Sequence, residues 1–210
     1  LDMGVINASY GVACSGAYHG CAKVIRCEHH NPGHAANMRL ALANSCNSYF
    51  CQIYRLTLDN NKDKAVKKGY TRWKDYMNAF GWGERLGVDL PNELPGNIPD
   101  TTEYNKDYRG SWNSCTNVTL GIGQDKMQVT PVQLANAMCI IANKGYYYTP
   151  HFVEKIENET SKDTLLNKFR EKHSALTHIS DQDYEAIHAG MQDVVESGTA
   201  RSARIPGISI

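Results

Sequence analysis

The stretch GIGQDKMQVTPVQLANAMCIIANKG, residues 121–145, runs from a glycine-containing loop into a helix with recognisable ends. Thr130 offers a hydroxyl for the N-cap, Pro131 suits the first turn, and Gln133 stands where it completes a capping box. Gly145 is placed to end the helix. The apolar residues at helical spacing, which we expect to face inward, are Leu134, Met138 and Ile141.

Further helical patterns lie on both sides of this stretch. Apolar residues recur at spacings of three and four over 42–53, and polar residues at 44–47 predict a break into two helices. A second apolar stripe predicts a helix over 62–79, and Ser180 begins a last helix that stops before Ser197. Strands are predicted over 146–153 and from 205 to 210.

Two segments show no regular pattern. Residues 1–36 are rich in cysteine and histidine without periodicity, and we expect them to be irregular. Residues 81–129 are rich in Gly, Pro, Asn and Asp, and a loop of this length is often functional. The sequence therefore predicts a mainly helical α+β protein with a few strands.

Composition narrows the class of protein. The 210 residues suit one domain, and 41% hydrophobic residues suffice for a core. With 22 basic and 22 acidic residues the charges balance, so no nucleic acid partner is expected. No stretch reaches the length of a membrane-spanning helix. The chain starts without a helix cap and stops in a strand-like run, so we expect the domain to continue beyond both ends.

Ser45-Cys46-Asn47 is the candidate catalytic motif. Enzymes that acylate a lysine-activated serine use a second hydroxyl and an amide in an S-x-N element, between S-x-x-K and K-T-G. The tripeptide alone is common, and its alternative interpretation is a polar break between two helices. The flanking sequence therefore has to distinguish a catalytic S-x-N element from a polar break between helices.

That neighbourhood resembles the class B penicillin-binding proteins, of the penicillin-binding protein 2 type. The resemblance spans about 37–210 and implies that 1–210 is part of a transpeptidase domain with the penicillin-binding and serine β-lactamase-like fold. The matching stretches, in family order, are 44–50, 80–83, 87–90, 96–99, 121–124, 129–135, 194–195, 198–200 and 205–207.

The resemblance implies an activity and its residues. Such proteins are peptidoglycan D,D-transpeptidases, which cross-link cell-wall stem peptides through a serine acyl-enzyme and are inhibited by β-lactams. Ser45 would pass a proton toward the leaving amine and Asn47 would hydrogen-bond the substrate amide. Trp112 and Gln124 would contact substrate, although Ser114 and Cys115 replace the Gly-Asp pair that often follows this tryptophan.

The S-x-x-K motif, which would contain the nucleophilic serine, is not found at the serines considered for it. Ser15, Ser161 and Ser197 are not followed by lysine three residues later. We therefore expect the nucleophile, its lysine and K-T-G to lie outside this chain, which alone should be inactive. The family further implies the periplasmic face of a bacterial inner membrane, with the anchor outside this chain, and partners in a membrane glycan polymerase and the elongation machinery.

The cysteines and histidines near the start of the chain predict a structural zinc. The best ligand set is Cys14, Cys27, His34 and Cys46, and some penicillin-binding protein 2 relatives hold zinc near S-x-N. A Cys14–Cys27 disulfide is the alternative. The remaining histidines, which we expect in solvent or at the rim of the site, are His19, His29 and His30.

Two other functions compete with the transpeptidase. One is a metal-stabilised scaffold in which the cysteine–histidine segment matters and catalysis lies elsewhere. The other is a serine β-lactamase or sensor of the same fold. The long 81–129 region favours the transpeptidase, and we identify no motif for a deacylating glutamate. An S-x-x-K before Leu1 and a K-T-G after Ile210 would decide for the transpeptidase.

Overall fold

The computed structural model describes residues 1–28, 31–60, 65–157, 164, 166–175 and 179–208. The chain forms two compact units. The first consists of Leu1–Thr71, Thr101–Asp125 and Ile179–Ile210, and the second of Arg72–Asp100 and Lys126–His178. The candidate catalytic and metal-binding residues all belong to the first unit.

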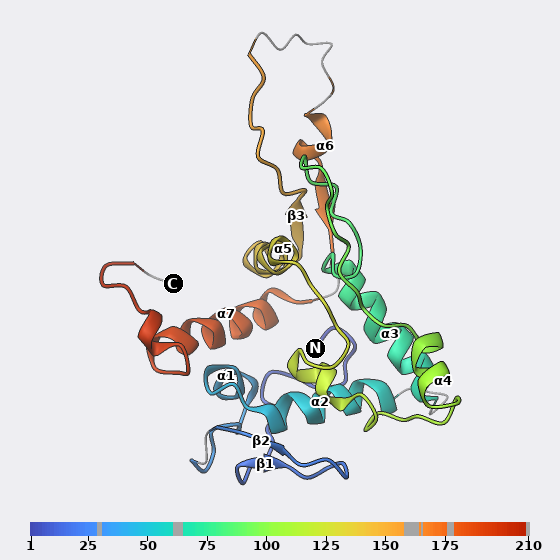
Figure 1. Ribbon diagram of the computed structural model, residues 1–210. Coiled ribbons are helices and arrows are strands. Elements are labelled where there is room, and N and C mark those ends of the chain that lie inside the picture. Colours follow the sequence, from blue (N-terminus) through green and yellow to red (C-terminus); the bar gives the residue numbers. More distant parts are fainter. Residues whose placement is uncertain (29–30, 61–64, 158–163, 165, 176–178, 209–210) are drawn as a thin grey trace. The chain divides into compact units, whose positions relative to one another are not determined.

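Three helices form the frame of the first unit (Figure 1). They are α1 (Met38–Ala43), α2 (Asn47–Asp59) and α7 (Asp181–Glu196), and α1 packs along α7. The predicted break between two helices is confirmed, since α1 ends before Asn44 and α2 begins at Asn47. Ser180 caps α7 as predicted, because its side chain accepts a hydrogen bond from the Asp183 N–H.

The core of the first unit reaches the candidate motif. Cys46 and Tyr49 are fully buried at the start of α2, beside the buried Met38 and Ala41 of α1. Cys27 and Ala35 from the N-terminal segment complete this cluster. Packing on both sides of the α1–α2 junction therefore fixes the backbone that carries Ser45 and Asn47.

The N-terminal segment is less irregular than predicted. Its strands β1 (Ala17–Tyr18) and β2 (Ile25–Arg26) pair antiparallel and contact α2. A disulfide joins Cys21, between these strands, to Cys115. Beside it, Arg55 of α2 donates to the Gly20 carbonyl at 2.6 Å. The tip of the hairpin is thus attached both covalently and by a charged hydrogen bond.

Removing the Cys21–Cys115 disulfide should lower stability strongly. Its closed loop spans 94 residues, so the bond restricts the unfolded chain, and the expected loss is about 4 kcal/mol. The measurement is urea unfolding of a Cys21→Ala, Cys115→Ala variant beside Cys139→Ala, which removes an exposed free thiol. Equal unfolding midpoints in the two variants would contradict a stabilising disulfide.

The predicted loop at 81–129 contains short helices. They are α4 (Thr101–Asp107) and the 3-10 helix η1 (Val118–Ile122), so the expectation of a long stretch without regular structure was wrong. Tyr104 of α4 is buried against Tyr70 and Trp112, with ring centroids 5.5 and 5.4 Å away. Aromatic packing orders this region, and a pattern of turn residues does not reveal it.

Helix α5 (Pro131–Ala142) of the second unit has the predicted capping box but not the predicted inner face. Leu134 and Met138 are 45% and 46% exposed, so their inward assignment was wrong. Gln133 is buried instead, and its amide donates to the carbonyls of Glu84 and Pro95. These hydrogen bonds turn the capping residue, rather than the leucine, toward the second unit's interior.

The helix predicted over 62–79 is confirmed from Val66 onward as α3 (Val66–Ala79), while residues 62–64 lie outside the described part of the chain. The remaining elements are short. They are β3 (Tyr146–Tyr148), α6 (Asn167–Arg170), β4 (Lys172–Ser174) and η2 (Arg201–Ala203). β3 pairs antiparallel with β4 and so confirms a shorter strand than the one predicted over 146–153.

The strand predicted from 205 to 210 is absent over 205–208, while 209–210 lie outside the described part of the chain. Gly207 has φ 80°, which turns the backbone out of the extended conformation that a strand requires. Among the described residues, no helix combines the length and the apolar character needed to cross a membrane.

Candidate active site

Ser45 occupies a tight turn between α1 and α2. Its φ of 48° lies in the left-handed region, which side chains other than glycine seldom adopt. The Ser45 N–H donates to the Leu42 carbonyl and the next N–H, of Cys46, donates to the Ala41 carbonyl, so α1 ends in a closed turn. The turn leaves the Ser45 side chain exposed while Cys46 is buried. A strained, exposed serine on a fixed backbone suits a reacting group.

The Ser45 hydroxyl is hydrogen-bonded to the hydroxyl of Thr199, with 2.8 Å between the two oxygens. Thr199 follows the end of α7, and its backbone N–H donates to the Ala43 carbonyl at 3.1 Å. Thr199 was not among the predicted site residues, although residues 198–200 belong to one of the stretches that carry the family resemblance. The contact joins positions 154 residues apart, and one sequence alone does not reveal such a pairing.

Asn47 is the first residue of α2, and its side chain faces the hairpin. The amide nitrogen donates to the Arg26 carbonyl at 2.8 Å. This hydrogen bond fixes which edge of the amide faces β2 and so orients the side-chain oxygen. An amide held in this way can accept a hydrogen bond from a substrate N–H.

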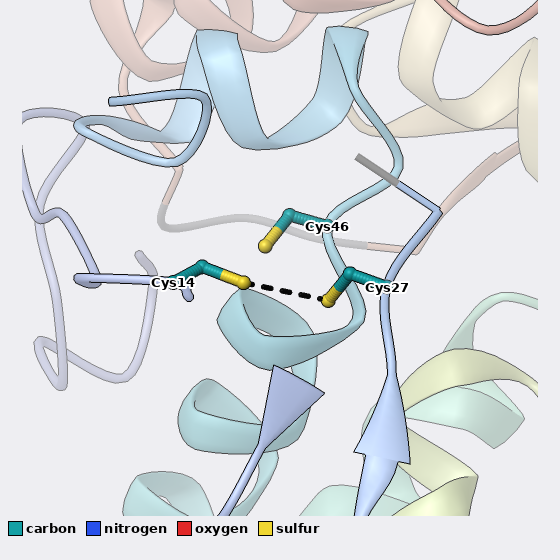
Figure 2. Close-up of side chains that lie close together, drawn as sticks. All are labelled: Cys14, Cys27 and Cys46. Atoms are coloured by element: carbon teal, nitrogen blue, oxygen red, sulfur yellow. Dashed lines mark hydrogen bonds between the residues drawn. The ribbon is translucent and has the colours of Figure 1, made fainter. Parts of the chain in front are cut away.

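Three thiols converge at the base of the same hairpin. Cys14 precedes β1, Cys27 follows β2 and Cys46 precedes α2, and Figure 2 shows their sulfur atoms pointing toward one another. All three sulfur atoms lie within 4.8 Å of one another. The sulfur atoms of Cys14 and Cys27 are 3.5 Å apart, close to the roughly 3.8 Å between thiolates of a tetrahedral zinc site. The donor set and its spacing fit zinc.

Hydrogen bonds to this thiol cluster favour a thiolate. The Ser48 N–H donates to the Cys27 sulfur at 3.3 Å, and the Ser48 hydroxyl lies 3.1 Å from the Cys14 sulfur. Burial acts to raise the pKa of Cys14, but hydrogen bonds led by Ser48 outweigh it and lower that pKa to about 7. Burial raises the pKa of Cys46 to about 12. A cation would have to displace a proton from Cys46, whereas Cys14 ionises readily.

The structure brings together three of the four predicted metal ligands. His34 is buried, its Nδ1 lies 2.7 Å from the Asn31 carbonyl oxygen, and it is not part of the thiol cluster. The alternative of a Cys14–Cys27 disulfide is not realised, because both side chains are free thiols. His19 is exposed as expected, while His29 and His30 lie outside the described residues.

The two predicted substrate contacts have different surroundings. Trp112 is 8% exposed, packs on Tyr70 and Tyr104, and donates from its ring N–H to the Asn105 side chain. That packing gives the ring a structural role, and its contact with substrate stays a prediction. Gln124 is exposed next to Gly123, whose φ of 73° ends η1, and its side chain is accessible to a ligand.

Comparison with known proteins identifies the class. The family model of the penicillin binding protein transpeptidase domain matches residues 1–210, so the chain belongs to this family. Peptidoglycan D,D-transpeptidase MrdA of Acinetobacter baumannii is 30% identical over 209 residues, covering 98% of this chain and 29% of that protein. Penicillin-binding protein H of Bacillus subtilis is 33% identical over 141 residues, covering 66% of this chain and 19% of that protein.

Solved structures of penicillin-binding protein 2 share the fold of this chain. PBP2 of Pseudomonas aeruginosa, in complex with WCK 5153, superposes with a TM-score of 0.72 at 25% identity, covering 96% of this chain and 43% of that one. PBP2 of Helicobacter pylori in complex with MreC has a TM-score of 0.72 at 24% identity, covering 99% and 37%. The predicted fold is confirmed, and the chain spans about a third of the curated MrdA relative's length.

Proposed function

We propose that the intact protein is a peptidoglycan D,D-transpeptidase that cross-links stem peptides and is acylated by β-lactams. One observation carries this proposal. In a chain that matches the transpeptidase family over its whole length, Ser45 and Asn47 stand together at the α1–α2 junction, the serine exposed and the amide oriented. The support from relatives is the name D,D-transpeptidase itself.

The proposed chemistry is acyl transfer in two steps. A serine outside this chain attacks a stem-peptide carbonyl, the new C–O ester bond forms, and the C–N bond to the leaving amine breaks. Ser45 delivers the proton that the leaving amine takes up, and the proton lost by the attacking serine, relayed by the lysine outside this chain, replaces it on Ser45. Asn47 accepts a hydrogen bond from the substrate backbone. An amine of a second stem peptide then attacks the ester, which forms the cross-link and returns the serine. Trp112 and Gln124 remain the proposed substrate contacts.

We further propose that the thiol cluster binds a structural zinc through Cys14, Cys27 and Cys46, and that His34, which is not part of the cluster in this structure, moves to become the fourth ligand when the metal binds. A zinc held by thiolates would fix the ligands' positions and add stability on folding. The zinc would also affect the catalytic motif, because two of its ligands are adjacent in sequence to residues that form the Asn47 hydrogen bond. Arg26 precedes Cys27 and Asn47 follows Cys46. If Cys27 and Cys46 both bound a zinc, they would also keep the Arg26 carbonyl at the Asn47 amide.

The proposed location is the periplasmic face of a bacterial inner membrane, with the anchor outside this chain. The proposed partners are a membrane glycan polymerase and the elongation machinery. The support is that a relative of the same fold has been solved in complex with MreC. The Cys21–Cys115 disulfide also suits an oxidising compartment.

Labelling with a fluorescent penicillin tests the function. We expect the full-length protein to give one stoichiometric band that survives denaturation, because the acyl-enzyme is covalent. The 210 residues alone should give none, because the proposed nucleophile lies outside them. Denaturing gel electrophoresis is the measurement. An unlabelled full-length protein would contradict the proposed activity, a band that decays within minutes would indicate a β-lactamase, and a labelled 210-residue chain would place the nucleophile inside it.

A further inference from the structure

We propose that Thr199 is a positioning residue, which holds the hydroxyl of Ser45 in the orientation that delivers a proton to the leaving amine. This inference rests on the proposed transpeptidase function and assigns a role to a residue outside the S-x-N motif. The observation that motivates it is the 2.8 Å hydrogen bond between the two hydroxyls, both of them on exposed side chains.

Backbone hydrogen bonds around Thr199 hold its hydroxyl next to Ser45. The Thr199 N–H donates to the Ala43 carbonyl, and the Ala200 N–H donates to the Val194 carbonyl. Gly198 passes so close to Ala43 that a Cβ there would overlap the Ala43 carbonyl oxygen. The segment after α7 is therefore pressed against the end of α1, directly beside the turn of Ser45.

The same two helices are held together further along. Arg39 of α1 and Asp193 of α7 form a two-pronged ion pair, with nitrogen–oxygen distances of 2.5 and 2.9 Å. The hydrogen bond to Arg39 lowers the pKa of Asp193, so the ion pair persists to a lower pH than it would for an unpaired aspartate. The ion pair between α1 and α7 thus helps to hold the segment that carries Thr199 in position.

A fixed hydroxyl beside Ser45 has a chemical consequence. A serine hydroxyl turns freely about its C–O bond, and a proton relay needs it in one orientation as the amine leaves. If the Thr199 hydroxyl donates to the Ser45 oxygen, fewer orientations of the Ser45 hydroxyl remain, and its own proton is available for the leaving amine. Thr199 does not itself have to touch the substrate.

The predicted effect depends on the leaving group. An amine leaving group needs a proton in the transition state, whereas a thiolate leaves without one because its conjugate thiol is far more acidic. Thr199→Val, which keeps the shape and removes the hydroxyl, should slow acylation by penicillin about 10-fold. Acylation by a thioester substrate should change less than about 3-fold. Thr199→Ser keeps a hydroxyl and should restore acylation by penicillin.

The experiment measures acylation rates of the full-length protein with a fluorescent penicillin and with a thioester analogue of the stem peptide. Thr71→Val is the matched control, since Thr71 is an exposed threonine whose hydroxyl donates to the Lys67 carbonyl of its own helix. Thermal melting checks folding, and Thr199→Ala replaces Thr199→Val if the valine variant melts early.

The outcomes separate the two proposals. Selective slowing with penicillin, and its recovery in Thr199→Ser, would support the positioning role. Equal slowing with both substrates, or no slowing, would overturn it while leaving the transpeptidase intact. A wild-type protein that penicillin does not acylate would overturn both.

Discussion

Replacing Ser45 with alanine in the intact protein is expected to slow acylation by penicillin about 100- to 10,000-fold, the usual cost of losing a proton-transfer group. The effect should fall on chemistry and leave folding intact. Ser45 is exposed, so alanine creates no cavity, and the bonds that close its turn come from the backbone. The measurement is the second-order rate constant of labelling by a fluorescent penicillin, with thermal melting in parallel.

Ser202→Ala is the matched control, because Ser202 is an exposed serine in the short helix η2 of the same unit. It should label at the wild-type rate. If the Ser45→Ala protein is labelled as fast as wild type, the S-x-N assignment is wrong. A slow rate together with a large loss of thermal stability would instead assign Ser45 to the fold.

Zinc removal is expected to have the second large effect. Protein purified without chelator should contain about one zinc per chain, and a structural zinc contributes on the order of 10 kcal/mol to folding. Some thirty residues around the hairpin must be ordered, at about 1–2 kcal/mol of backbone entropy each. Cys46→Ser should therefore lose the metal and melt at a much lower temperature. Metal analysis and calorimetry measure the two effects.

Cys139→Ser is the control, because Cys139 is an exposed free thiol outside the thiol cluster. It should keep its zinc and its melting temperature. Thiol titration of the metal-free protein should find Cys14, Cys27 and Cys46 reduced. A protein that contains no metal and yields a linked Cys14–Cys27 peptide by mass spectrometry would rule out the zinc site.

Local sequence signals predicted most helices correctly. Capping residues and apolar spacing located α2, α3, α5 and α7, because these signals act within a turn or two of the chain. The prediction of which residues of α5 face inward was wrong, because contacts with residues far away in the sequence decide it. Gln133 is buried because it bonds carbonyls 38 and 49 residues away, and this partnership outweighs the hydrophobicity of Leu134.

In the candidate site, too, features of the local sequence were predicted and contacts between distant segments were not. Ser45 and Asn47 were predicted from the family resemblance of their neighbourhood, and the three clustered cysteines from the gathering of zinc-ligand residue types near the start of the chain. The Cys21–Cys115 disulfide and the Ser45–Thr199 hydrogen bond were missed, since each joins segments more than 90 residues apart. With seven cysteines in the chain, spacing alone leaves the pairing undetermined.

The sequence separations within the disulfide and within the thiol cluster favour one order of events during oxidative folding. Cys14 and Cys27 are 13 residues apart, whereas Cys21 and Cys115 are 94 apart. Contact probability falls with loop length to the power 3/2, so the short pair meets roughly 20 times more often in the unfolded chain. The wrong bond therefore has the kinetic advantage. A cation that captured the short pair before the oxidant arrived would act as a protecting group, leaving the distant pair to be oxidised.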